Sequence, residues 1–244
     1  MISPLHLARL GFTNANHLRQ RIAEATLAGA AHDFARAARL MIRDPEPRPA
    51  PARAERVVVT LSSVPHRRSH LVPTLRSLVD QICPPDRIVL AWPEHSLRTL
   101  KPYPRLPHIP AGVEVIRCAD EGPATKLLPA LRAEPDAVVV VVDDDHIYPD
   151  TFLEDLLAAH RSAPTSTVGL RGYYAQNGSN PDNFPHVCGT ALRQPRAVDV
   201  LMGMWGYLIP PGSLDEGYTI SVVGPPKSAG TTTSGSRRIS PTAA

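Results

Sequence analysis

An acidic run follows the most apolar segment of the chain. Five valines, residues 138–142, are followed by Asp143, Asp144 and Asp145. Adjacent carboxylates repel one another, and a hard divalent cation held by one or two of them, with phosphate oxygens and water, offsets that repulsion. We therefore predict a metal site at Asp143 and Asp145, with Asp144 directed elsewhere. The alternative is a helix cap or a solvated loop, because Asp favours caps and a helix begins near Thr151.

A second segment suited to anions lies upstream, in residues 121–131. Gly122 and Pro123 make a turn, after which Lys126 opens a leucine-rich helix. Thr125 is able to cap that helix. Free amides and a cation at one helix start favour an anion, with Lys126 as the point charge for a diphosphate. An ordinary capped helix with a solvated Lys126 explains the same residues equally well.

Two familiar phosphate-binding motifs are missing from the sequence. No G-x-x-x-x-G-K-[ST] loop accompanies the acidic run, so a nucleoside triphosphatase lacks its amide cradle. No G-x-G-x-x-G follows the first predicted strand, which disfavours a dinucleotide site. The acidic run therefore needs another explanation than these two classes.

Buried strands and amphipathic helices alternate through the middle of the chain. Five apolar or β-branched runs predict strands, at residues 56–62, 87–92, 113–118, 137–142 and 167–172. Apolar residues at helical spacing predict a helix between the first two strands, with Leu71, Leu75, Leu78, Val79 and Ile82 on one face. This alternation predicts an α/β fold with a mostly parallel sheet, in which ligands bind beyond the carboxyl ends of the strands. Residues just after Thr60 and Val142 are therefore candidates for function.

The N-terminal part of the chain predicts a helix and a linker. A helix is expected over residues 15–42, with an apolar stripe of Leu27, Ala31, Phe34, Ala38 and Met41. The proline-rich segment behind it forbids helix and predicts an extended linker. The expected organisation is a helical extension (1–43), a Pro/Ala-rich linker (44–55), a catalytic domain (56–212) and a disordered tail (213–244).

Composition narrows the class of partner. The formal net charge of +3 and the absence of long like-charge blocks argue against nucleic acid. No segment reaches the roughly 20 apolar residues of a membrane span. The three cysteines, Cys83, Cys118 and Cys188, form neither a C-x-x-C pair nor an even set. We therefore expect a cytoplasmic protein without a disulfide framework.

The order and spacing of four blocks carry a family resemblance. VVVTLSSVPHR, LVPTLRSLVDQICPPDRIVLAWP, GPATKLLPAL and VVVVVDDDHIYPD fall within residues 56–175. Together they resemble the nucleotide-sugar-binding half of glycosyltransferases of the GT-A (Rossmann-like) fold, of the family-two-like kind. The resemblance implies a nucleoside diphosphate near Thr60, Pro65 and Arg67. It also implies that the DxD-type run holds Mn²⁺ or Mg²⁺.

The same resemblance assigns the remaining candidate residues. Thr125, Lys126 and Asp144 are expected near the nucleotide or the sugar. The segment VDVLMGMWGYLIPP, residues 198–211, is similar to the glycine-rich acceptor side of the family and brings in Gly203 and Trp205.

The catalytic base is the part of the pattern that does not match. An inverting enzyme of this fold uses a carboxylate as general base, and the expected acidic motif does not follow residue 211. The nearby substitutes are Asp199, Asp215 and Glu216. Asp199 is only a weak candidate, and the catalytic base is otherwise unassigned.

The tail contains that motif in another reading frame. Residues 217–244 read as disorder. These residues can be back-translated with codons that end in G or C. When that DNA is read from the third base of each codon, it can encode a peptide containing NDDVWIS, which resembles the missing base-bearing motif. We therefore interpret the C-terminus as frameshifted or truncated by a single-base change near residues 214–217.

These observations lead to one functional prediction and two alternatives. We predict metal-dependent, inverting transfer of a sugar from a nucleotide-sugar donor to a glycan or small-molecule acceptor in the intact ancestor, with this chain impaired. One alternative is a catalytically dead nucleotide-sugar binder. The other is a nucleotidyltransferase, which should carry a glycine-rich loop after the first strand, where LSSVPHRRS has none.

Overall fold

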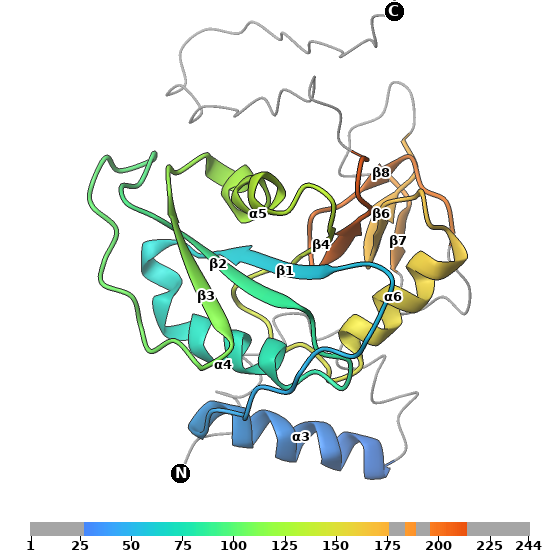
Figure 1. Cartoon of the computed structure of the whole chain (residues 1–244), viewed down its shortest axis with the longest axis horizontal. Helices are drawn as coiled ribbons and strands as arrows, with labels where there is room; N and C mark the ends of the chain where they lie inside the picture. Colours follow the sequence, from blue (N-terminus) through green and yellow to red (C-terminus); the bar gives the residue numbers. More distant parts are fainter. Residues whose placement is uncertain (1–26, 176–183, 189–195, 214–244) are drawn as a thin grey trace, which may run out of the picture.

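A six-stranded sheet forms the centre of the protein. The computed structural model describes residues 27–175, 184–188 and 196–213 (Figure 1). The sheet order is β3-β2-β1-β4-β9-β5. Its strands are β1 (Val57–Ser62), β2 (Arg87–Pro93), β3 (Val113–Cys118), β4 (Val138–Val141), β5 (Val168–Gly169) and β9 (Tyr207–Ile209). The pairs among β1 to β4 are parallel, whereas β9 runs antiparallel to β4 and β5. The predicted α/β fold with a mostly parallel sheet is confirmed.

Alternating side chains of the central strands build two cores, one on each face of the sheet. Val57, Val59 and Leu61 of β1 join the larger core, which α4 (Arg68–Val79) and α6 (Phe152–Ser162) cover. Val58 faces the other core, under α5 (Leu128–Ala133). Figure 1 shows α5 on the face of the sheet opposite α4. Because both faces are covered, the strands are apolar throughout, as parallel sheets require.

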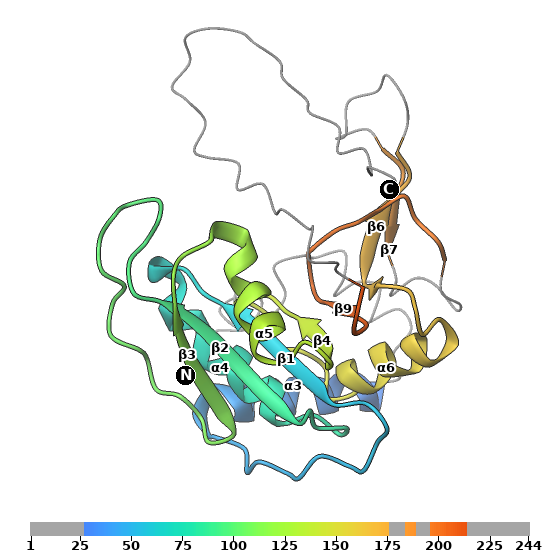
Figure 2. The same cartoon turned by 45° about the horizontal axis from the view of Figure 1, so that its top comes forward.

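A second, three-stranded antiparallel sheet stands beside β9 (Figure 2). It consists of β6 (Arg171–Tyr173), β7 (His186–Cys188) and β8 (Val200–Leu201) in the order β7-β6-β8. The strand predicted over 167–172 is therefore two strands, divided at Leu170 between the two sheets. Leu170 N–H donates to the carbonyl of Gly206 at 3.2 Å, which links the sheets at the division.

The N-terminal helix buries a different face from the one its apolar spacing predicts. Helix α3 (Leu27–Ile42) lies outside α4, with the part of the predicted helix before residue 27 outside the described residues. Phe34, placed on the buried stripe by the sequence, is 57% exposed. Arg36, Ala37 and Leu40 are buried instead. The prediction was wrong because α4 offers polar acceptors that make a buried arginine favourable.

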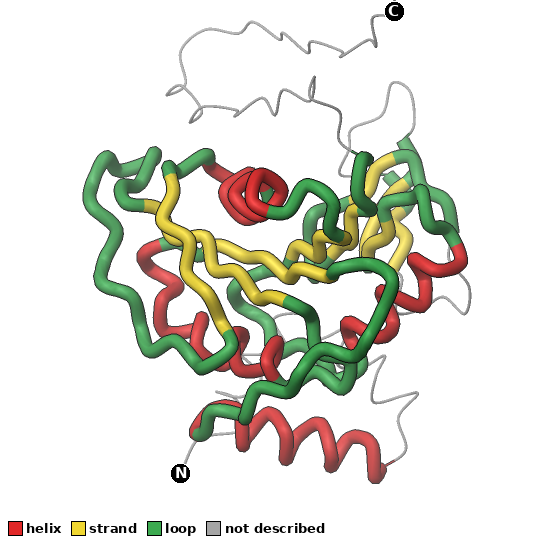
Figure 3. The backbone as a smooth tube through the Cα atoms, viewed as in Figure 1, coloured by secondary structure: helices red, strands yellow, loops and turns green. Residues whose placement is uncertain are grey.

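The proline-rich linker is extended, as its composition predicts, and lies along the domain (Figure 3). Arginines fix it at intervals. Arg76 Nε donates to Asp44 Oδ1 at 2.6 Å, and Arg48 Nη2 donates to the carbonyl of Gln81 at 2.6 Å. Arg53 Nη2 donates to the carbonyl of Pro84. These contacts tie α3 to the α/β domain through its connecting segment as well as through helix packing.

Helix α4 and the residues just after its end carry a buried polar stripe that holds the segment after the acidic run. Thr74, Ser77 and Gln81 have exposed fractions of 1%, 0% and 1%. Gln81 Nε2 donates to the carbonyl of Pro149 at 2.7 Å, and Gln81 Oε1 accepts the amide of Leu153 at 3.0 Å. The stripe therefore fastens the turn that connects the acidic run to α6.

The apolar face of the same helix is largely as predicted. Leu71, Leu75, Leu78 and Val79 are buried. Ile82, which the spacing also placed there, lies beyond the end of α4 and is 52% exposed.

None of the described helices is long and apolar enough to cross a bilayer. The alternative reading of the tail concerns residues outside the described part of the chain.

Replacing Gln81 by Met tests the role of the polar stripe. Met preserves the volume but leaves the carbonyl of Pro149 and the amide of Leu153 without their partner. Because an unsatisfied buried group costs about 1–3 kcal/mol, we expect the free energy of unfolding to fall by about 2–4 kcal/mol in urea titrations. Ile82→Ala is the control, and as a change at an exposed position it should cost less than about 1 kcal/mol. Equal losses for the two variants would contradict the assignment.

Candidate active site

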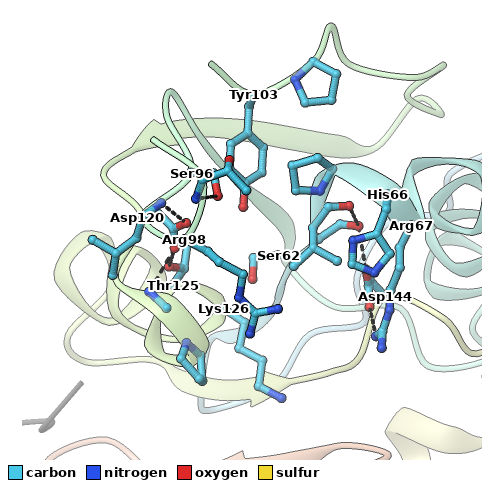
Figure 4. Close-up of a pocket in the computed structure, with 18 of the residues that line it drawn as sticks. Ser62, His66, Arg67, Ser96, Arg98, Tyr103, Asp120, Thr125, Lys126 and Asp144 are labelled. Carbon is cyan, nitrogen blue, oxygen red and sulfur yellow. Dashed lines mark hydrogen bonds and ion pairs between the residues drawn. The ribbon is translucent and has the colours of Figure 1, made fainter. Parts of the chain in front are cut away.

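A cleft of about 1160 Å³ opens where the carboxyl ends of the parallel strands meet (Figure 4). Three segments form its walls, the loop between β1 and α4, the rim loop (residues 94–104) between β2 and β3, and the 3₁₀ turn η2 (Gly122–Lys126). Asp143 and Asp144 lie on its surface. The prediction that residues after β1 and β4 gather at one site is therefore correct in geometry.

Asp143 is held by two donors from different parts of the chain. Its Oδ1 pairs with Lys126 Nζ at 3.0 Å, and its Oδ2 accepts the amide of Trp205 at 2.8 Å. Its own amide donates to Tyr148 Oη at 2.7 Å. Burial raises the pKa of the Tyr148 phenol well above its usual value, so the ring stays neutral beside the carboxylates. Asp143 is thus fixed in position by its side-chain and main-chain partners.

Asp144, predicted to be directed away from the metal and near the nucleotide or the sugar, has a buried side chain that borders the cleft. Its side chain is buried, and its carboxylate accepts hydrogen bonds from Ser63 Oγ at 2.5 Å and Arg67 Nη1 at 3.2 Å. Its carbonyl accepts the hydroxyl of Thr74 at 3.0 Å. Asp144 therefore joins the first loop of the cleft to α4.

Asp145 lies close to two basic side chains, one of which, Arg67, it shares with Asp144. Arg67 Nη1 lies 3.2 Å from Asp145 Oδ2, and His146 Nδ1 lies 2.8 Å from Asp145 Oδ1. The close approach of His146 is the main cause that holds the pKa of this carboxyl below its usual value; burial opposes it, and the charge of Arg67 adds to it. The acidic run lies well before the start of α6, so it is not that helix's cap.

Lys126 is positioned through its main chain. Thr60 Oγ1 donates to the carbonyl of Lys126 at 2.9 Å, and Lys126 Nζ donates to the carbonyl of Gly203 at 2.8 Å. Thr60 is fully buried and absent from the cleft surface, so it orients Lys126 and does not reach a ligand. Lys126 lies at the end of η2, and α5 begins only at Leu128. The predicted helix start at Lys126 is therefore a 3₁₀ turn.

Asp120 joins two walls of the cleft, a role the sequence reasoning missed. Its Oδ1 accepts the amide of Gly122 at 2.9 Å and the hydroxyl of Thr125 at 3.3 Å, while its Oδ2 accepts the amide of Leu97 at 2.8 Å. Thr125 accepts the amide of Glu121 at 2.7 Å and does not cap α5. The free amides expected at this turn are thus partly used by Asp120.

The rim loop adds residues that the sequence reasoning also missed. Arg98 and Tyr103 line the cleft, and Figure 4 shows the Arg98 side chain reaching into it. Among the described residues Arg98 has no ion-pair partner, unlike Arg67 and Lys126. Burial raises the pKa of Tyr103 to about 12, so its phenol is neutral at pH 7. The rule that ligands bind at carboxyl ends could have found these residues, because they follow β2.

The other predicted residues fall into two groups. Pro65, Arg67, Thr125 and Lys126 line the cleft. Gly203 and Trp205 contact Lys126 and Asp143 through main-chain groups, and the Trp205 ring lies 4.1 Å from the guanidinium of Arg171. Asp199 is exposed, accepts the amide of Ala175 at 2.9 Å, and does not line the cleft. Asp215 and Glu216 lie outside the described residues.

The predicted metal ligands fit a cation only in part. Within the described ranges, no three His, Cys, Asp or Glu side chains are grouped to hold a metal. Asp143 and Asp145 provide two carboxylate ligands, which is the number that Mg²⁺ usually takes from a protein before phosphates and water complete its shell. Their present partners are Lys126, Arg67 and His146. Of the two predicted ligands, Asp143 lies on the cleft surface and Asp145 does not.

Comparisons with known proteins place this site in a family context. The chain matches the model of Glycosyl transferase family 2 over residues 64–209, more than half of its length. A solved structure, mannosyltransferase PcManGT from Pyrobaculum calidifontis in complex with GDP-Man and Mn2+, is 17% identical, with a TM-score of 0.34. The match covers 67% of this chain and 45% of that one. No curated protein matched.

The lowered pKa of Asp145 predicts a pH-dependent stability difference. A carboxyl whose folded pKa is depressed stabilises the fold above its unfolded pKa of about 3.8, and that stabilisation is lost as pH falls through the lower, folded pKa. Asp145→Asn should therefore be less stable than the parent at pH 6, with the gap closing as pH falls below 3.8. Urea unfolding in EDTA measures it. A gap that does not change with pH would contradict the prediction.

Proposed function

Because the chain belongs to glycosyl transferase family 2, we propose that its cleft binds a nucleotide-sugar donor and that the protein's chemistry is sugar transfer to a glycan or small-molecule hydroxyl. The observation that carries this proposal is the Lys126–Asp143 pair at the end of β4, facing the cleft. A carboxylate and a cation, each fixed by main-chain contacts, lie at the place where α/β sheets bind their ligands.

The diphosphate of the donor is recognised by three cations. Lys126 and Arg67 line the cleft and are paired with the acidic run in the ligand-free protein, and Arg98 extends from the rim loop. A bound diphosphate gives Lys126 and Arg67 a second anionic partner. It also pairs with Arg98, which has no ion-pair partner among the described residues. Charge-assisted hydrogen bonds to phosphate are about twice as strong as neutral ones, so the bonds that Arg98, Lys126 and Arg67 add favour the bound state.

Mn²⁺ or Mg²⁺ would be held by Asp143 and Asp145. When bound, such a cation supplies Lewis-acid stabilisation of the charge that develops on the leaving diphosphate. The chain's own part is to keep both carboxylates oriented. The amide of Trp205 and the pair with Lys126 orient Asp143, while Arg67 and His146 orient Asp145.

Transfer with inversion needs one further group. The acceptor oxygen attacks the anomeric carbon, the bond from that carbon to the diphosphate oxygen breaks, and the acceptor proton passes to a base. Each carboxylate that lines the cleft, Asp120, Asp143 and Asp144, already accepts hydrogen bonds from protein donors. We therefore assign the base to the NDDVWIS segment of the alternative reading of the tail.

The metal dependence of binding tests the proposal. Titration calorimetry with uridine or guanosine diphosphate should detect binding in the presence of Mn²⁺ or Mg²⁺ and little in EDTA. The double variant Asp143→Asn, Asp145→Asn should lose that dependence. Asp136→Asn removes an exposed carboxylate away from the cleft and is the matched control. If the double variant binds as the control does, the acidic run is not the metal site.

We also expect donor binding and sugar transfer to be separable, because the carboxylates that line the cleft already accept hydrogen bonds from the protein. The present chain should bind the donor as well as a version carrying the alternative reading after residue 216, but should release nucleoside diphosphate with acceptor far more slowly. General-base assistance alone is worth about 10²- to 10⁴-fold. Equal release by both versions would place the base within residues 1–216, with Asp199 the first residue to replace.

A further inference from the structure

Helix α3 lies outside the segment that matches the family, yet one of its side chains reaches the back of the acidic run. The match begins at residue 64, and α3 ends at Ile42. Arg36 is the buried charged residue of this helix, at 7% exposed. A buried guanidinium is costly unless its donors are satisfied, so its partners indicate what it holds in place.

Arg36 joins α4 to the turn behind the acidic run. Its Nε donates to Asp80 Oδ2 at 2.7 Å, and its Nη1 donates to the carbonyl of Tyr148 at 2.7 Å. Its Nη2 lies 3.3 Å from the carbonyls of Ser77 and Asp80. The Tyr148 contact spans 112 positions of sequence, and it is the one that leads toward the cleft.

Tyr148 passes this constraint to Asp143. Its phenolic oxygen accepts the amide of Asp143 at 2.7 Å, while its own amide donates to Ser77 Oγ at 3.0 Å. The ring is fully enclosed and lies 4.5 Å, centroid to centroid, from Phe152. Tyr148 can therefore neither rotate nor shift without moving the backbone of Asp143. The carbonyl and the phenol of one residue connect Arg36 to the start of the acidic run.

We propose that Arg36 is a positioning residue for Asp143, which makes the N-terminal helix part of the active-site architecture. Arg36 fixes the backbone at Tyr148, and Tyr148 fixes the backbone at Asp143, whose carboxylate faces the cleft. The functional half of this inference rests on the proposed nucleotide-sugar site; the structural half does not.

A neighbouring arginine on the same helix separates this role from simple charge pairing. Arg39 Nη2 donates to the same oxygen, Asp80 Oδ2, at the same 2.7 Å, but makes no contact with Tyr148. Asp80 consequently keeps a cation when Arg36 is replaced. The contact with Tyr148 is what distinguishes Arg36 from Arg39, so the two variants form a matched pair.

The first experiment measures amide hydrogen exchange by NMR in the absence of any ligand. In Arg36→Met, the Asp143 amide should exchange about ten-fold faster than in the parent, as it should in Tyr148→Phe, which removes its acceptor. Arg39→Met should leave it unchanged. The Asp143 amide of the double variant Arg36→Met, Tyr148→Phe should exchange no faster than that of Tyr148→Phe alone. Both changes act on the same hydrogen bond, the one from the Asp143 amide to the Tyr148 phenol. If Arg36→Met does not fold, Arg36→Lys keeps a cation opposite Asp80 with a shorter reach and serves in its place.

The second experiment measures affinity for guanosine or uridine diphosphate with Mn²⁺. Loss of a group that orients a metal ligand costs about 10- to 100-fold in affinity, so Arg36→Met should bind at least ten-fold more weakly than Arg39→Met. Equal exchange and equal affinity for the two variants would overturn the proposal. Faster exchange with unchanged affinity would overturn its functional half. If the parent itself binds no nucleoside diphosphate, the proposed function fails, and the exchange rates alone decide whether Arg36 orders Asp143.

Discussion

Three consecutive carboxylates at the end of a buried strand repel one another, and the local structure is organised around their compensation. Lys126 pairs with Asp143, Arg67 with Asp144 and Asp145, and His146 with Asp145. Since like charges at contact distance cost several kcal/mol in a low-dielectric site, these partners offset the repulsion within the acidic run.

The surrounding elements can be understood from what they do for those cations and carboxylates. The loop after β1 supplies Ser63 and Arg67, and η2 supplies Lys126, which Thr60 orients through its carbonyl. The backbone before β9 contributes the amide of Trp205, whose φ of 66° turns the chain toward Asp143. A cleft with cations on its walls follows from this arrangement, because Lys126 and Arg67, which pair with the acidic run, also line the cleft.

The sequence predicts the central strands well, because a parallel sheet covered on both faces requires continuous apolar runs such as residues 138–142. The prediction from sequence fails where the local residue pattern and the tertiary contacts disagree. The apolar stripe of α3 is not its buried face, because the acceptors that bury Arg36 lie more than 40 positions away in sequence. β9 has three residues, too few for a periodicity, and pairs antiparallel with β4, which is distant in sequence. In the site, Asp143 and Lys126 were found from their residue types, whereas Asp120, Arg98 and Tyr103 lie on connections whose sequence has no pattern.

The central claim is that the Lys126–Asp143 pair marks the diphosphate site of a nucleotide-sugar donor. A crystal structure with guanosine or uridine diphosphate and Mn²⁺, recorded at a wavelength where manganese scatters anomalously, tests it most directly. The account predicts an anomalous peak beside the carboxylates of Asp143 and Asp145, with phosphate oxygens within hydrogen-bonding distance of Lys126 Nζ. A diphosphate bound elsewhere, or bound in the cleft without manganese while Lys126 still contacts Asp143, would contradict it.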